Sequence, residues 1–337
     1  MPYNVENTHQ ENYNIAIIGA GQIGSRHLQA IARLEGNTRI RLVDPSEESL
    51  RIARERFSQV YKESASKRIE LICDRFIDNL SESVDLAIVA TSSNVRSTVI
   101  KELIRKKEVK NFILEKVLFQ REAEYYEIDD LLRKHNIPTW VNCYMRSRDF
   151  YQKLGEEMDL DKKVEMRVEG SLWGMGCNSI HFIDYFSYVT GCKDFSFTNC
   201  RLNDNLIDSK RSGFVEFSGE LVGQNSDGHS LMLICHDKGS DPIRINIRNG
   251  STNHEIIDCT DHVIHRMSDG DKETEKKVDI PFQSQTTNKL VHQIRNGDKC
   301  DLTPYHDSMN LHLPLIRTLI EQMQNLSGKS EDVCPIT

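Results

Sequence analysis

The stretch YNIAIIGAGQIG, residues 13–24, decides the fold class of this 337-residue chain. Its first half is a continuous apolar run, which is typical of a β-strand buried on both faces of a parallel sheet. Its second half carries glycines at positions 19, 21 and 24, and residues 25–34 then have the pattern of an amphipathic helix. A strand, a glycine-rich turn and a helix in this order predict a dinucleotide-binding site. In such a site Gly19 permits the turn, Gly21 admits the pyrophosphate and Gly24 allows close packing of the helix.

Asp44 tells which dinucleotide is expected. It ends the next predicted strand, residues 39–44, twenty positions after Gly24. A carboxylate at that place accepts hydrogen bonds from the adenosine ribose hydroxyls and repels a 2′-phosphate. Pro45 and Ser46 supply no arginine that could offset this repulsion. The sequence therefore predicts NAD(H) rather than NADP(H).

The rest of the chain falls into two parts. Up to about residue 148, strands alternate with helices, as in a parallel α/β sheet: strands at 70–73, 84–90, 112–114 and 138–143, and helices at 45–57, 94–107 and 122–135. Later segments alternate apolar with polar residues between turn clusters: strands at 164–172, 213–221, 231–236, 243–248 and 254–259, with helices at 178–189, 283–295 and 305–324. We predict a mobile tail (1–12), a doubly wound Rossmann domain (13–148), and an α+β domain with a large open, mostly antiparallel sheet (149–330).

Composition excludes several classes of protein. The chain has 43 basic and 51 acidic residues, a net charge of −8, which argues against nucleic acid or an anionic membrane as partner. There is no apolar run of about 18 residues that could span a bilayer. Nine scattered cysteines without a CxxC pair predict reduced thiols in a cytoplasmic protein and no bound metal. The charged run at 269–277 is expected to be a solvated turn.

Three motifs resemble the glucose–fructose oxidoreductase / inositol dehydrogenase (Gfo/Idh/MocA) family. Gly24-Ser25-Arg26-His27 is similar to that family's GxxGxRH start, Glu115-Lys116 stands where the family has Glu-Lys-Pro, and His181-Phe182-Ile183-Asp184 resembles its HxxD. The resemblance implies hydride transfer to or from a sugar-like hydroxyl. It also implies homodimers or homotetramers built on the C-terminal sheet.

Two positions depart from that family's pattern. Val117 replaces the proline that usually follows the lysine, and Cys177 stands where many of its dehydrogenases carry a catalytic aspartate, four residues before the histidine. These departures indicate a specialised branch of the family, whose substrate the sequence does not name.

Oxidation of a secondary alcohol needs a base with a pKa near neutrality, and His181 is the natural candidate. Asp184, three residues on, shares its helical face and would orient the imidazole, hold a substrate hydroxyl or cap local backbone. Lys116, at the carboxyl edge of a strand, would stabilise developing alkoxide charge. The non-catalytic alternatives are that His181 is a structural histidine and that Lys116 is a surface lysine paired with Glu115.

Small polar residues after strand 84–90 either contact the cofactor or only cap the next helix. The expected cofactor-binding residues are Gly19, Gly21, Gln22, Ile23, Gly24, Asp44, Thr91, Ser92, Asn94, Glu115 and Lys116. Arg146 suits a carboxylate or phosphate and Trp173 suits a sugar face. The expected substrate-binding residues are Lys116, Arg146, Trp173, Asn178 and His181.

Three functions remain open at this point. The leading one is an NAD(H)-dependent oxidoreductase acting on a sugar, polyol or nucleotide sugar. The second is a redox-neutral epimerase or glycosidase that keeps its NAD bound. The third is a non-catalytic NAD-binding sensor or assembly protein. The departures from the family's pattern at Cys177 and Val117 are the features that support it.

Overall fold

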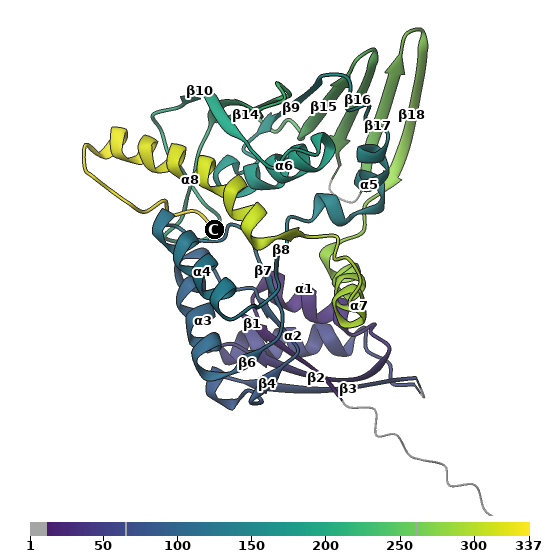
Figure 1. Ribbon diagram of the computed structural model, residues 1–337, viewed down its shortest axis with the longest axis vertical. Helices are drawn as coiled ribbons and strands as arrows, with labels where there is room; N and C mark the ends of the chain where they lie inside the picture. Colours follow the sequence, from purple (N-terminus) through teal and green to yellow (C-terminus); the bar gives the residue numbers. More distant parts are fainter. Residues whose placement is uncertain (1–11, 65, 260–261) are drawn as a thin grey trace, which may run out of the picture. The chain divides into compact units, whose positions relative to one another are not determined.

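The structure is a computed structural model that describes residues 12–64, 66–259 and 262–337. The described chain forms two compact units, whose elements are labelled in Figure 1. The first unit holds the described residues up to Thr91 together with Glu102–Phe112 and Gln283–Asp298, and the second unit holds the rest. The predicted tail lies outside the described residues except for Asn12. These units do not follow a single cut in the sequence, and the predicted boundaries at 148 and 330 stay a prediction.

The N-terminal sheet has the strand order β19-β8-β7-β5-β1-β2-β3. β1 pairs in parallel with β2 on one side and with β5 on the other, and β2 pairs in parallel with β3. Because the strand order reverses at β1, the sheet is doubly wound, which confirms the predicted Rossmann architecture. The strands are β1 (Tyr13–Ile18), β2 (Gly36–Val43), β3 (Lys67–Asp74), β5 (Leu86–Val89), β7 (Phe112–Leu114), β8 (Thr139–Val141) and β19 (Thr303–Pro304).

Burial explains why the first of these strands forms in the middle of the sheet. Ala16, Ile17 and Ile88 are at most 1% exposed, and because successive side chains of a strand point to opposite faces, β1 and its neighbour β5 contribute apolar residues to the core on both faces of the sheet. The first unit also contains a short parallel pair, β4 (Ser83–Val84) with β6 (Glu108–Val109), and the 3-10 turn η1 (Ile77–Asn79).

A late segment of the chain belongs to the first unit. The 3-10 turn η3 (Gln283–Gln285) and α7 (Thr287–Asn296) pack against α1 (Gln22–Ile31), which also contacts α2 (Glu47–Ser58). The buried His27 ring on α1 lies 2.8 Å from the Thr287 hydroxyl, measured from Nδ1 to Oγ1. Residues 283–298 were expected in the C-terminal domain, so this return is a finding of the structure.

The second unit contains an eight-stranded sheet with the order β10-β13-β14-β9-β15-β16-β17-β18. Its neighbours are antiparallel except for the parallel pair β14 and β9, which confirms the predicted mostly antiparallel sheet. The strands are β9 (Val164–Ser171), β10 (Ser196–Leu202), β13 (Gly219–Gln224), β14 (Ser230–His236), β15 (Arg244–Asn249), β16 (Thr252–Asp258), β17 (His262–Asp269) and β18 (Lys272–Asp279).

Helices cover one face of this sheet. α6 (Met175–Thr190) packs on β14 and β9, and it contacts α5 (Asp149–Glu156) and α8 (Tyr305–Ser327) in turn. Along β9, Val164, Met166 and Val168 are buried beneath these helices, while the residues between them are exposed or half-buried. Other elements of the unit are α4 (Glu122–Lys134), the 3-10 turn η2 (Met145–Ser147), and the strand pair β11 (Ile207–Asp208) with β12 (Val215–Glu216), whereas α3 (Ser93–Lys106) is shared with the first unit.

The structure corrects one prediction. The run 269–277 is not a solvated turn throughout, because Lys272–Asp279 forms the strand β18. Its charges suit an edge strand, where both faces meet water and like charge discourages further pairing. β18 pairs with β17 over eight positions, and Arg266 on β17 also binds Glu275 on β18 at 2.7 Å across this edge.

Candidate active site

The three glycines after β1 have three different surroundings. Gly19 has φ +98°, and a Cβ on it would lie 2.9 Å from the carbonyl carbon of Ala90. A Cβ on Gly24 would lie 1.7 Å from the carbonyl oxygen of Gly19. Among the described residues, a Cβ on Gly21 would meet no atom within 4 Å, and no side chain caps the N-terminus of α1 there. An uncapped helix start with room for close approach fits a pyrophosphate.

The Asp44 carboxylate stands at the end of β2 and holds the glycine turn. Its Oδ2 accepts a hydrogen bond from the Ala20 N–H at 2.7 Å, and its Oδ1 accepts one from the Ser46 N–H at 2.8 Å. Each carboxylate oxygen has a second acceptor site, so both can still bind ribose hydroxyls. Of the other predicted contacts in this unit, Gln22 is exposed and Ile23 and Thr91 are half-buried.

At the start of α3 the predicted polar residues bind one another. The Ser92 hydroxyl donates to the Asn94 side-chain oxygen at 2.7 Å. The next residue, Ser93, is buried, and its N–H donates to the Thr337 hydroxyl at 3.0 Å. The first contact joins two side chains and the second comes from the distant Thr337, so both alternatives for these residues, helix capping and cofactor contact, stay predictions.

Lys116 at the end of β7 is held by the first turn of α6. Its Nζ donates to the carbonyl oxygen of Cys177 at 3.0 Å and to the side-chain oxygen of Asn178 at 3.2 Å. The Asn178 amide is oriented by donating to the Trp173 carbonyl at 2.7 Å. Two of the three ammonium protons are thus used, and the third is left for another acceptor.

The chain around Lys116 is braced by buried polar side chains. Glu115 is 7% exposed, so it is not a surface side chain, and it accepts a hydrogen bond from the Asn142 amide at 2.5 Å. The peptide bond between Lys116 and Val117 is cis although no proline follows. Arg96, 2% exposed, donates to the carbonyls of Val117 and Leu118, the latter at 2.9 Å.

His181 lies one turn further along α6 and is 6% exposed. Burial, with the charge of Lys116, lowers its pKa well below the usual value, so the imidazole is neutral at physiological pH, and its pKa lies below the near-neutral value expected from the sequence. Its ring meets the Tyr144 ring edge-on at 4.5 Å. Its Nδ1 is buried and has no hydrogen-bond partner among the described residues.

Asp184 is fully buried, and its contacts run to Arg146 rather than to His181. Its Oδ1 accepts a hydrogen bond from the Thr303 hydroxyl and lies 3.7 Å from the Arg146 guanidinium, which itself donates to Thr303 at 2.7 Å. Burial raises the pKa of Asp184 to about 6 against the opposing charge of Arg146. Among the described residues no hydrogen bond joins His181 and Asp184, so the predicted orienting of His181 by Asp184 stays a prediction.

Trp173 is packed into the core of the second unit. It is 7% exposed, donates from Nε1 to the Ile234 carbonyl at 2.8 Å and meets the Phe182 ring at 5.5 Å. Its stacking on a sugar, like the substrate roles of Arg146 and Asn178, stays a prediction.

Sequence reasoning missed three residues that support these side chains: Arg96, Glu216 and Thr303. Each reaches the cluster from another element, 21 to 119 positions away from its partner. Only the structure shows that Arg96 is buried, and because an arginine is almost never fully buried without a partner, its burial draws attention to the carbonyls that it binds.

The doubly wound sheet and its glycine turn form a dinucleotide-binding fold of the kind that oxidoreductases use. Residues 13–143 match the GFO_IDH_MocA model, described as an oxidoreductase family with an NAD-binding Rossmann fold. The resemblance predicted from the sequence, with its NAD class of cofactor, is thereby confirmed. None of the curated proteins matches the chain in sequence.

Solved structures with the same fold span almost the whole chain. The dehydrogenase MviM from Clostridium difficile is 15% identical with a TM-score of 0.69, over 91% of this chain and 99% of that one. An oxidoreductase from Agrobacterium radiobacter, solved with NAD+, L-tartaric acid and magnesium, is 12% identical with a TM-score of 0.68, over 95% and 98%. The 3-ketoreductase KijD10 from Actinomadura kijaniata, solved with NADP and TDP-benzene, is 11% identical with a TM-score of 0.67, over 91% and 97%. At these identities the likeness shows the fold alone.

Among the residues that the structure describes, no helix combines the length and the apolar character needed to cross a membrane.

Proposed function

We propose that the chain is an NAD(H)-dependent oxidoreductase that moves a hydride to or from a secondary alcohol of a sugar, polyol or nucleotide sugar. One observation carries this proposal: the first turn of α6 holds the Lys116 ammonium at 3.0 and 3.2 Å, and the same helix carries the buried, neutral His181. A cation with a proton left to donate and a neutral base are the two groups that alcohol oxidation needs.

In this proposal the side chains divide the work. Lys116 donates its third hydrogen bond to the substrate oxygen and stabilises the negative charge that develops there. His181 takes the hydroxyl proton, and the carbon–oxygen double bond forms as the hydride leaves the same carbon. NAD, when bound, supplies the nicotinamide that accepts this hydride. Asp184 acts by holding Arg146, which binds a polar or anionic part of the substrate.

The cofactor is proposed to be NAD(H) in preference to NADP(H). Gly21 and the start of α1 would take the pyrophosphate, and Asp44 the adenosine ribose. Its negative charge next to the ribose opposes a 2′-phosphate. Fluorescence titration with NADH and NADPH measures this directly, and tighter binding of NADPH would contradict the assignment.

The test of the activity is the near-ultraviolet absorbance of NADH, followed with NAD and then with NADH across inositols, hexoses, uronates and nucleotide sugars. We expect turnover with one class, its loss in Lys116→Ala, and wild-type turnover in Lys101→Ala, which changes an exposed lysine that pairs with Glu127 on the surface. Equal turnover in both variants would remove Lys116 from the mechanism.

The same assay separates the other two candidates. A redox-neutral epimerase or glycosidase would convert substrate without net NADH and stop when its NAD is stripped. A sensor or assembly protein would bind NADH and convert nothing. The position of Lys116 between Cys177 and Asn178 favours an enzyme, because a ligand-sensing role does not require a fixed ammonium.

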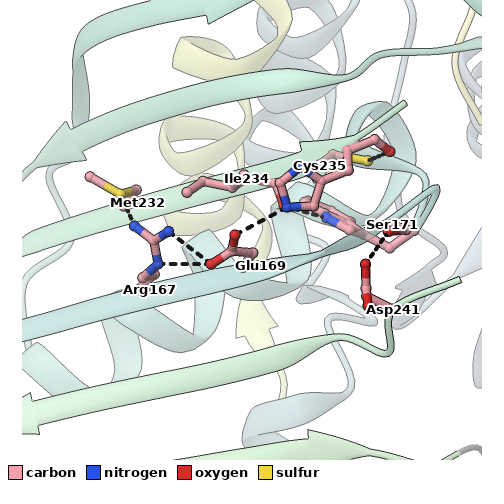
Figure 2. Close-up of polar contacts among 9 residues, drawn as sticks. Arg167, Glu169, Ser171, Met232, Ile234, Cys235 and Asp241 are labelled. Carbon is pink, nitrogen blue, oxygen red and sulfur yellow. Dashed lines mark hydrogen bonds and ion pairs between the residues drawn. The ribbon is translucent and has the colours of Figure 1, made fainter. Parts of the chain in front are cut away.

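A homodimer or homotetramer is proposed to form through the open face of the eight-stranded sheet. Figure 2 shows part of this face, where Arg167 binds Glu169 at 2.8 Å and reaches Met232 on the next strand. Further along, Arg266 binds Glu255 at 3.0 Å. Charges of both signs in alternation can meet their own copy across a two-fold axis. A groove on this face is lined by Asn246, Asn253, Glu255, Arg266, Met267, Ser268, Glu273, Thr274 and Glu275.

Light scattering after gel filtration measures the oligomeric state. Arg266→Glu is expected to weaken the assembly, whereas Arg75→Glu, on an exposed ion pair of the first unit, leaves it intact. A monomeric wild-type chain would contradict the proposal.

All nine cysteines are free thiols, which supports a reducing compartment and hence the proposed cytoplasmic location.

A further inference from the structure

Glu216 is the acidic side chain at the first turn of α6, although it comes from β12. Its Oε2 accepts a hydrogen bond from the Cys177 N–H at 3.2 Å. Gly174, the residue before α6, has a left-handed conformation with φ 74° and no capping side chain of its own. A carboxylate at this end of a helix is stabilised by the helix dipole and by N–H groups that have no partner within the helix.

The surroundings leave no room for a side chain between the helix and this carboxylate. A Cβ on Gly176 would lie 2.9 Å from Oε2 of Glu216 and 2.9 Å from Cγ2 of Ile336. The strand that carries Glu216 is itself fixed, because the Val215 N–H donates to the Pro335 carbonyl at 2.8 Å. These contacts therefore fix Glu216 against the first turn of α6.

Cys177 connects this carboxylate to Lys116. Its carbonyl oxygen accepts a hydrogen bond from the Lys116 ammonium, its N–H donates to Glu216, and its thiol donates to the Gly174 carbonyl oxygen at 3.6 Å. Burial raises the pKa of the Cys177 thiol to about 12, with the charge of Glu216 acting in the same direction, so the thiol stays protonated. A neutral thiol cannot balance the Lys116 ammonium, but the Glu216 carboxylate behind it interacts electrostatically with that ammonium.

We propose that Glu216 is a positioning residue of the active site, which caps the first turn of α6 and, through Cys177, fixes the place of Lys116 and supplies the negative charge that position 177 does not carry. This inference rests on the proposed function for its catalytic consequence. Its structural part, the coupling of Glu216 to Cys177 and Lys116, is measurable without any substrate.

Two labelling rates test the coupling on the full chain. Glu216→Gln keeps a hydrogen-bond acceptor and removes the charge, so the pKa of the Cys177 thiol falls. A fall of about one unit raises the thiolate fraction about tenfold, and the lower nucleophilicity of that thiolate reduces the gain in alkylation rate to roughly threefold. Glu216→Ala also removes the cap, so the Lys116 amine, freed from the helix turn, is acylated faster. Peptide mass spectrometry after iodoacetamide or an activated ester reads both rates.

Glu220→Gln, on β13, the next strand along the chain, is the matched control and is expected to label like the wild type. Wild-type labelling of Cys177 and Lys116 in both Glu216 variants would overturn the proposal.

Turnover decides whether the coupling serves catalysis. With a substrate from the assay above, we expect Glu216→Ala to lower kcat by about tenfold to about a hundredfold with KM little changed, and Glu216→Gln to recover part of that loss. Faster labelling with unchanged kcat would make Glu216 a cap without a part in the site and overturn the proposal. If the wild type converts no substrate, the proposed function fails, and the labelling rates still decide the coupling.

Discussion

A buried pair of histidines predicts how the stability of the second unit depends on pH. His254 on β16 and His265 on β17 are 2% and 4% exposed. Their rings stack at 5.3 Å with 9° between the planes, and Nδ1 of His254 lies 3.1 Å from Nε2 of His265. Burial lowers the pKa of both rings, that of His265 to about 4. Lys276 acts in the same direction on both, and Glu157 opposes it at His254.

The size of the effect follows from the linkage of protonation to folding. A histidine with a lowered pKa in the folded chain binds its proton more readily when unfolded, so the free energy of unfolding falls as the pH falls below about 6.5. With a folded value of about 4, His265 alone removes about 2 kcal/mol between about pH 7 and about pH 5. The decline continues down to about pH 4 and levels off below it.

Urea unfolding at both pH values, followed by circular dichroism, measures this decline. His265→Gln keeps an amide that can bond His254 but does not titrate, so we expect it to lose about 2 kcal/mol less than the wild type over the same range. His236→Gln, which changes an exposed histidine of the same sheet, is the control and should follow the wild type. The reasoning is refuted if His265→Gln and the wild type lose the same free energy.

Two further predictions concern the residues that hold the cofactor turn and Lys116. Gly21→Ala is expected to keep the melting temperature but weaken NADH binding, because its Cβ meets open space where the pyrophosphate approaches. Gly24→Ala is expected to lower both the melting temperature and NADH binding, because its Cβ would lie 1.7 Å from a carbonyl oxygen. Thermal melting and NADH titration measure both effects, and equal behaviour of the two variants would contradict the expectation. Arg96→Met is expected to lower the free energy of unfolding by about 2–4 kcal/mol, since two buried carbonyls lose their donor. A urea midpoint within error of the wild type would contradict this second expectation.

The N-terminal sheet could be predicted because its signals are local. An apolar run that ends in glycine determines where β1 stops and α1 starts, and the observed strand, Tyr13–Ile18, ends at the residue before Gly19. Asp44 follows β2 directly for the same reason. The alternating strands of the second unit were also readable, since one face of each is buried under helices and the other is not.

Other elements could not be predicted, because tertiary contacts decide them. β10 is exposed or half-buried along its whole length, and β18 is charged, so neither has an apolar stripe to detect. Helical spacing puts Asp184 near His181, but the carboxylate turns to Thr303, which follows it by 119 residues. Spacing along a helix predicts which residues share a face, and it does not predict which partner a side chain selects.

The change at position 177 shows why a motif and a site can disagree. Judged by its helix alone, the chain has lost a carboxylate, and the thiol in its place stays uncharged because burial raises its pKa to about 12. In space, however, the Glu216 carboxylate of β12 lies at the same turn. It accepts a hydrogen bond from the Cys177 N–H at 3.2 Å and interacts electrostatically with Lys116. A negative charge beside an ammonium acts by distance and dielectric, whichever strand carries it. Cys177 therefore argues against catalysis only if Glu216 can be neutralised without effect on Lys116.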